Sequence, residues 1–179
     1  METKNLLLRN TELSDCKCFY HWEKDPEIIE YLSIDKDIQY EDVVKDFVLA
    51  SIDPEMLMFT ILSKSENTPI GRIIISRIAS KEKSLDITKL YIGKKNYQGK
   101  GHGIELMEAM LQYVFFDLNM ERVTLDYYVN NRRAELLYNK LGFKSEGVLR
   151  NSTIKDGKYY DLKLMSMLRN EYFSLYKKV

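Results

Sequence analysis

The sequence has 179 residues with 27 basic and 27 acidic side chains, so its formal net charge is zero. This balance excludes steering of the whole molecule toward nucleic acid or a membrane surface, and the length suits one domain, expected to cover residues 1–179. No apolar run approaches the roughly 20 residues of a membrane span, and the start of the chain lacks a signal-peptide profile, so we expect a cytoplasmic protein without membrane contact.

Hydrophobic periodicity predicts alternating strands and helices. In chain order they are a strand at 6–9, helices at 14–25 and 40–51, strands at 56–62, 71–78 and 85–92, a helix at 104–118, a strand at 122–129, a helix at 132–141, and strands at 143–154 and 160–168. Ser14 is expected to cap the first helix and Pro26 to end it, while Asn67-Thr68-Pro69 and Asp156-Gly157 are expected to form turns. The order predicts an α/β (α+β) fold, a mixed central sheet of about seven strands with helices on both faces.

A glycine-rich run, Tyr97-Gln98-Gly99-Lys100-Gly101-His102-Gly103, joins the predicted strand at 85–92 to the helix that follows it. Glycines let successive backbone N–H groups converge on a phosphate, and a helix N-terminus adds partial positive charge there. The spacing does not fit a dinucleotide fingerprint, and Gly101 stands where a P-loop needs Ser or Thr after the lysine. The run therefore predicts a different phosphate-binding turn, the alternative being a plain strand-to-helix turn.

Two motifs together resemble one enzyme superfamily. The pattern Gln98-x-x-Gly101-x-Gly103 resembles the acetyl-CoA loop of GNAT acyltransferases. The segment Asn131-Arg132-Arg133-Ala134-Glu135-Leu136-Leu137-Tyr138-Asn139-Lys140-Leu141-Gly142-Phe143 is similar to a signature found about thirty residues further along in the same family. Segments 146–150 and 156–161 resemble the ribosomal-protein N-acetyltransferase and spermidine acetyltransferase branches, and the whole resemblance covers residues 84–172.

The resemblance implies the GNAT acyl-CoA N-acyltransferase fold and an N-acetyltransferase that uses acetyl-CoA as cosubstrate without a metal. The acetyl group would pass to a primary amine, on a protein N-terminus or a small amine such as a polyamine, by direct attack on the thioester. Amides from Gln98 to Gly103 would bind the pyrophosphate. A bulge at Ile92 or Gly93 would expose a backbone N–H to the thioester oxygen.

The signature helix supplies the remaining expected site residues. By the resemblance, Ala134 leaves space for the cofactor arm, Asn131 bonds its amides, and the phenol of Tyr138 protonates the departing thiolate. Each residue also has an ordinary interpretation: Asn131 as a helix N-cap, Tyr138 as a packed ring and Ile92 as a core residue.

The general base stays open between Asp86, Asp126 and water. His102 is not expected to be the base, because a side chain in the phosphate loop points at the wrong end of the cofactor. His21 and Trp22 are expected either to border the acceptor cleft or to pack.

The charged residues around these motifs have either a binding role or an ordinary place on the solvated surface. An acidic cluster of Glu23, Asp25, Glu27 and Glu30 would favour a polyamine, although a solvated surface is the alternative. Basic residues near the motifs either contact the cofactor phosphates or form a solvated rim; they are Lys94, Lys95, Lys100 and Arg133.

Other classes of protein are weighed on the same residues. A catalytically weak acyl-CoA-binding regulatory module is the main alternative, against which the intact Asn131, Ala134 and Tyr138 argue. An RNA-associated protein is disfavoured because the tyrosines follow core spacing and show no RNP-like motif. Cys16 and Cys18 lack partners for a metal set and are expected to be reduced thiols. Acceptor identity and a homo-oligomeric state stay open.

Overall fold

The computed structural model describes residues 1–176 as one seven-stranded sheet with flanking helices. In chain order the elements are β1 (Leu6–Asn10), α1 (Cys16–Glu23), α2 (Pro26–Ile29), α3 (Tyr40–Ile52), β2 (Leu57–Ser63), β3 (Thr68–Ser76), β4 (Ser84–Ile92), α4 (His102–Gln112), β5 (Arg122–Tyr128), α5 (Arg132–Leu141), β6 (Lys144–Lys155), β7 (Lys158–Leu168) and α6 (Arg169–Tyr176). The strand order is β1-β2-β3-β4-β5-β7-β6, and only β4 and β5 pair in parallel. The predicted mixed sheet with helices on both faces is therefore confirmed.

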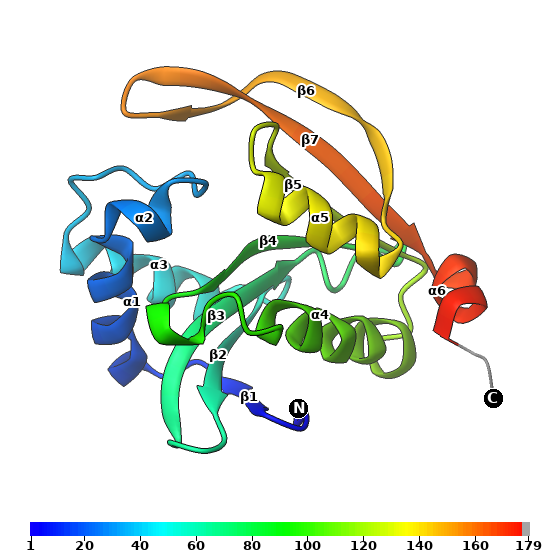
Figure 1. The fold of residues 1–179 in the computed structure, drawn as a ribbon, viewed down its shortest axis with the longest axis horizontal. Helices are drawn as coiled ribbons and strands as arrows, with labels where there is room; N and C mark the ends of the chain where they lie inside the picture. The colour runs from blue at the N-terminus through cyan, green and yellow to red at the C-terminus, as the bar shows by residue number, and fades with distance from the viewer. Residues whose placement is uncertain (177–179) are drawn as a thin grey trace.

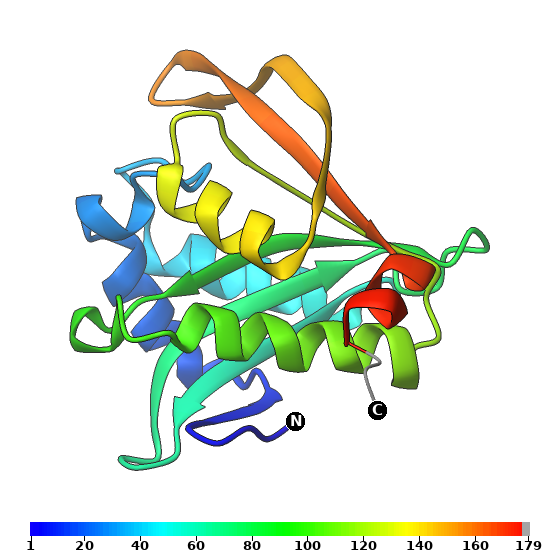
Figure 2. The same cartoon turned by 45° about the vertical axis from the view of Figure 1, so that its right-hand side comes forward.

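The two faces of the sheet carry separate apolar contacts. α4 crosses one face, where Leu106, Met107 and Met110 are fully buried against the sheet. α1 and α3 lie on the other face, where Phe19 and Val43 belong to a second apolar cluster. Figure 2 shows α4 in front of the sheet and α3 behind it. Alternation along the strands explains this division, because successive side chains point to opposite faces.

β4 and β5 separate halfway along their length. Their parallel pairing ends at Ile87 and Leu125. On its other edge β4 stays paired with β3, but the register shifts so that Ile74 faces Lys89 and Ile75 faces Ile87, which leaves Thr88 as a bulge. A bulge bends the strand that contains it. The bend at Thr88 lies where β4 begins to diverge from β5. The sheet thus opens at its centre (Figure 1).

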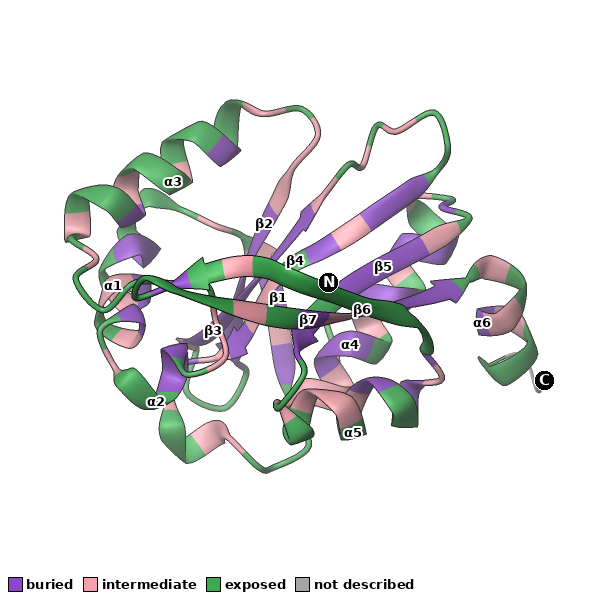
Figure 3. Cartoon of the chain, turned by 90° about the horizontal axis from the view of Figure 1, so that it is seen from above, coloured by how far each residue is buried: buried purple, intermediate pink, exposed green. Residues whose placement is uncertain are grey.

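β6 and β7 form a long ribbon joined by the expected turn. Asp156 and Gly157 have φ values of 47° and 74°, a pair of left-handed residues suited to a tight hairpin. Seen from above, most of β6 is exposed while β4 and β5 beneath it are mostly buried or half-buried (Figure 3). The ribbon therefore projects beyond the core, and its tip reaches back over α2.

Several boundaries differ from the sequence-based prediction. Ser14 does not cap α1: it lies in a 3-10 turn, where the Asp15 carboxylate accepts from the Glu12 amide at 2.9 Å. The residues Thr68 and Pro69 belong to β3 rather than to a turn. The predicted helix at 104–118 begins at His102 and passes into a π-helical turn after Gln112. The short helices α2 and α6 were not expected.

Candidate active site

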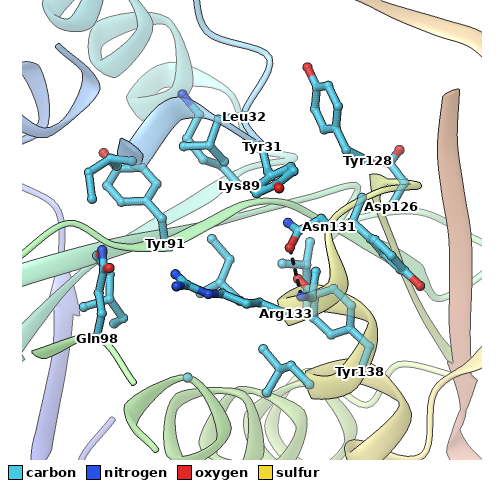
Figure 4. A pocket seen from close by; sticks show the side chains of 18 of the residues that line it. Tyr31, Leu32, Lys89, Tyr91, Gln98, Asp126, Tyr128, Asn131, Arg133 and Tyr138 are labelled. Atoms are coloured by element: carbon cyan, nitrogen blue, oxygen red, sulfur yellow. Dashed lines mark hydrogen bonds between the residues drawn. The ribbon is translucent and has the colours of Figure 1, made fainter. Parts of the chain in front are cut away.

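The opening between β4 and β5 leads into a cavity of about 500 Å³. β4 contributes one wall, β5 the opposite wall, the glycine-rich loop with the start of α4 one end, and α2 with the segment after it a roof. Asn131, Ala134 and Tyr138 line the cavity from α5. Figure 4 shows Asp126, Asn131 and Tyr138 on one side of this space and Gln98 and Tyr91 on the other.

The glycine-rich loop presents unpaired amides to solvent. Gly99 and Gly101 adopt φ values of 71° and 85°, and a Cβ at either position would meet no heavy atom within 4 Å. The backbone N–H groups of Gly99, Lys100 and Gly101 donate to no acceptor among residues 1–176. The first turn of α4, at His102 and Gly103, leaves further amides without intrahelical partners. These groups fit a phosphate, and an added Cβ would intrude on the space it needs.

Gln98 has a different role from the one expected for its amide. Its N–H already donates to Lys95 O at 3.0 Å, so it is not available to a pyrophosphate. The side-chain Nε2 donates to Ile92 O at 2.7 Å. Gln98 thereby fastens the loop to the end of β4 and places the following amides.

The bulge expected at Ile92 or Gly93 lies instead at Thr88. Ile92 is in register with Gly71, and the Gly93 amide donates to Ile70 O at 2.8 Å. A Cβ on Gly93 would lie 2.1 Å from Cδ2 of Trp22, so this glycine permits α1 to pack on the end of β4. Gly93 is thus a packing glycine, and Ile92 contributes to the cavity wall.

Two of the basic residues near the loop form ion pairs with carboxylates, and another faces the cavity. Lys94 is 2.5 Å from Glu66, and Lys95 lies 2.8 Å from Asp25 and 2.9 Å from Glu27. Arg133 lines the main cavity, and its side chain crosses toward Gln98 in Figure 4. Arg133 is therefore the cation of the expected rim that faces the cavity.

Lys100 and His102 occupy the outer side of the loop. Lys100 lines a second cavity beside the β2–β3 turn and does not line the first. His102 borders both cavities, its ring tilted against Tyr97 at a centroid distance of 5.6 Å and its Nδ1 3.6 Å from Glu105 Oε2. His102 thereby links the loop to the start of α4, consistent with a role other than base.

Asn131 and Tyr138 lie on the cavity side of α5. Asn131 Oδ1 accepts from the Ala134 amide at 3.1 Å, so the predicted N-cap exists and the residue also lines the cavity. Tyr138 is buried, with its ring tilted against Tyr127 and Phe143 at 5.6 and 5.8 Å. Burial, with the charges of Asp126 and Tyr127 adding to it, raises the pKa of Tyr138 far above its usual value. The phenol stays protonated near neutral pH and is able to act as a proton donor.

The two candidate carboxylates differ in position. Asp86 lies outside the cavity, accepting from Thr124 Oγ1 and pairing with Arg77 at 3.2 Å. Asp126 lines the cavity and is exposed to solvent. Burial, and to a lesser extent the Asp86 charge, raise the pKa of Asp126. Of the two, only Asp126 faces the space in which a substrate amine would bind.

The roof of the cavity was not foreseen from the sequence. His21 and Trp22 do not line the cavity, and the segment after α2 takes the place expected for them, through Tyr31, Leu32 and Ser33. Ser33 Oγ lies 3.2 Å from Tyr128 Oη and 2.9 Å from Thr153 Oγ1, which joins this segment to β5 and β6. These contacts span about a hundred residues of sequence, so periodicity could not signal them.

Three of the four residues of the acidic cluster are paired, while Glu30 is exposed and forms no ion pair among residues 1–176. Glu23 is buried on α1, where its Oε1 accepts from Arg72 at 3.0 Å and from Tyr91 at 2.8 Å. Asp25 and Glu27 share Lys95, as described above. Neither the solvated surface nor the polyamine site expected for Glu23 therefore exists at that residue.

The fold and this cavity together define an acetyl-CoA-dependent N-acetyltransferase. Residues 5–144 match the model of the acetyltransferase (GNAT) domain family. Because that match covers well over half of the chain, the protein belongs to the GNAT acetyltransferase family.

Full-length relatives agree with this assignment. The chain is 28% identical over 173 residues to p20, an uncharacterized N-acetyltransferase of Bacillus licheniformis, with 95% of this chain and 96% of that protein covered. It is 25% identical over 169 residues to the spermidine N(1)-acetyltransferase of Vibrio cholerae, covering 94% and 96% of the two chains. The crystal structure of that spermidine N-acetyltransferase with CoA and spermine superposes with a TM-score of 0.84, at 25% identity, over 94% of this chain and 98% of the other.

Proposed function

We propose that the chain transfers the acetyl group of acetyl-CoA to the primary amine of a small molecule by direct attack of the amine on the thioester. The observation that carries the proposal is that Gly99, His102 and Gly103 of the glycine-rich loop border the same cavity between the separated strands as Asn131 and Tyr138. A relative that acts on spermidine supports a small amine over a protein N-terminus as the acceptor.

Acetyl-CoA, when bound, supplies the activated acyl group. Amides of Gly99 to Gly103 would hold its pyrophosphate, and Arg133 is placed to add a positive charge from α5. β4 from Thr88 to Ile92 has no partner on its β5 side, so its backbone groups are available to the acyl-bearing arm and to the thioester oxygen.

Two residues would move protons during the reaction. Asp126, directly or through a water molecule, accepts a proton from the incoming ammonium, and the raised pKa of Asp126 suits this exchange. The new C–N bond forms as the C–S bond breaks. Tyr138 donates its phenolic proton to the departing sulfur, and the nitrogen, which carries a surplus proton once the C–N bond has formed, releases that proton through solvent to restore the Tyr138 phenol. No metal enters this scheme, and the cytoplasmic location expected from the sequence stays a prediction.

Ligand binding and turnover test the proposal separately. We expect acetyl-CoA to raise the melting temperature of the protein, because a ligand that binds only the folded state stabilises it. Release of CoA thiol in the presence of small amines measures turnover. We expect the rate of release to be unchanged after treatment with a chelator. Binding without turnover of any amine would favour the regulatory module, and absence of binding would contradict both functions.

A further inference from the structure

A buried group of charged residues adjoins the end of the cavity that α1 and α2 cover. Glu23 and Arg72 have side chains only 2% exposed and form an ion pair at 3.0 Å, with Arg72 stacked on the Phe19 ring at 4.3 Å. Lys89 lies 3.6 Å from the same Glu23 oxygen. The group therefore holds two cations for one carboxylate, because Asp46 acts on Lys89 only from a longer distance.

Lys89 is the member of this group that reaches the cavity. It follows the Thr88 bulge on β4 and lines the same space as Asp126 and Tyr138, with its side chain 21% exposed. In Figure 4, Lys89 lies on the α1–α2 side of the pocket, beside Leu32, while Asp126 and Tyr138 lie on the opposite side. Burial lowers the pKa of Lys89, which the nearby Glu23 only partly offsets. Lys89 shares its carboxylate partner, Glu23, with Arg72. A partly buried ammonium in this position can stabilise a further anion.

Three of the four acids in the cluster are paired within the protein, and the fourth, Glu30, does not line the cavity. Glu23 bonds Arg72 and Tyr91, while Asp25 and Glu27 bond Lys95. Within the described residues, the carboxylate that faces the cavity without an ion-pair partner is Asp126. Asp126 suits one reacting amine, whereas a second ammonium placed near Lys89 would be repelled.

We propose that the acceptor is a small amine that also carries a carboxylate, with the amine between Asp126 and Tyr138 and the carboxylate bound by Lys89. This inference rests on the proposed function and specifies its substrate class. The apolar side chains of Tyr31 and Leu32 border the space between the two charged ends, which suits a hydrocarbon linker. The acceptor therefore differs from the polyamine of the structurally similar relative.

A panel of acceptors tests the proposal with the unmodified enzyme. CoA-thiol release is measured with a chain-length series of ω-amino carboxylates and with α-amino acids, each beside its carboxamide, and with spermidine. We expect kcat/KM for the best carboxylate to exceed that of its carboxamide about 10-fold or more, because a charged hydrogen bond is lost in the amide. Higher kcat/KM for spermidine than for every carboxylate would overturn the inference while leaving the proposed function intact.

Variants of Lys89 locate the effect. Lys89→Met keeps the length of the side chain without its charge, and it leaves the Glu23–Arg72 pair in place. We expect it to raise KM for the carboxylate about 10-fold, with KM for the carboxamide and for acetyl-CoA unchanged, and we expect Lys89→Arg to retain the preference. Lys163→Met is the matched control, since Lys163 is 27% exposed and paired with Glu135 outside the cavity.

The outcomes distinguish the role of Lys89 from the proposed enzymatic function. Equal losses for carboxylate and carboxamide in Lys89→Met, or a preference for the carboxamide in the unmodified enzyme, would overturn the role of Lys89. Acetyl-CoA binding without acetylation of any member of the panel would overturn both this inference and the proposed enzymatic function. Circular dichroism and the melting temperature of each variant exclude loss of folding as the cause.

Discussion

The ammonium group of Lys155 donates a hydrogen bond to the backbone carbonyl of Ile29, a residue 126 positions earlier in the chain. It also donates to Glu30 O at 3.2 Å. Lys155 is 8% exposed at the tip of the β6–β7 ribbon, and its charge lies at the C-terminal end of α2, where a helix favours a cation. The ribbon is thereby fastened to the element that roofs the cavity.

Lys155→Met should loosen that roof. The substitution removes the Lys155 bonds to Ile29 O, which keeps its bond from the Leu32 amide, and to Glu30 O, so the segment from Tyr31 to Ser33 would be held less firmly over the acceptor end. We expect KM for the amine to rise several-fold while KM for acetyl-CoA is unchanged, as measured by steady-state kinetics. Lys158→Met, on the exposed face of the same hairpin, is the control. Identical rises of both KM values would contradict the assignment.

Tyr138→Phe tests the proton donor. The ring still packs against Tyr127 and Phe143, and the hydroxyl has no hydrogen-bond partner within the described chain, so stability should change little. Loss of general acid catalysis should lower kcat on the order of 100-fold, with KM for acetyl-CoA nearly unchanged. Tyr113→Phe, whose ring packs on Phe59 away from the cavity, is the comparison. An unchanged kcat across the pH range would make Tyr138 a packing residue.

Gly101→Val should abolish most cofactor binding. Gly101 has a φ of 85° and open space where a side chain would project, so the added atoms would enter the region in front of the loop amides. Isothermal titration with acetyl-CoA measures the expected loss of affinity. Gly157→Val is a strict control, because Gly157 also has a positive φ, of 74°, and no neighbour within 4 Å, but lies at the hairpin turn. Equal effects of the two substitutions on binding would show that backbone strain, not the phosphate site, is responsible.

Asp126→Asn tests the base through the pH dependence of rate and of stability. Burial raises the pKa of Asp126 in the folded chain, so the stability linked to its protonated form is present below the unfolded pKa and is lost as pH rises through the folded pKa. Asp126→Asn should therefore be slightly more stable than the unmodified protein at neutral pH and no more stable in acid, the gain being small because Asp126 is exposed to solvent. Its kcat should fall on the order of 100-fold, and the acidic limb of the rate profile should disappear. Chemical denaturation at both pH values and a pH series of initial rates provide the measurements; a retained acidic limb would favour water as the base.

Local signals explain which elements could be predicted. α5 agrees with the prediction from its first residue to its last, because Asn131 caps its start and Gly142 ends it in a left-handed conformation. α2 is only four residues long, too short for a periodic pattern to mark it. The 3-10 turn before α1 displaced the expected cap because the longer Asp15 side chain, and not Ser14, reaches the Glu12 amide.

Contacts between distant segments explain what was missed in the site. The bulge at Thr88 depends on the register between β3 and β4. The sequence of β4 alone does not predict that register. The Glu23 side chain finds Arg72 and Tyr91 only after α1 packs on the sheet, so a cluster that reads as surface charge becomes a buried ion pair. The cofactor motifs were accessible to sequence reasoning because their residues are close together in the chain, whereas the acceptor end combines α2, β4, β5 and their neighbours.

The early end of the β4–β5 pairing at Ile87 and Leu125 gives this protein two strand edges in its interior. Exposed edges normally invite pairing with a foreign strand, and proteins usually cover or charge them. Here the edges face a cavity of about 500 Å³, a volume that suits an extended chain of amides and methylenes and not a folded partner. Substrate binding would then complete a gap in the sheet, so the amides of β4 beyond Thr88 should exchange with deuterium more slowly in the presence of acetyl-CoA than in its absence.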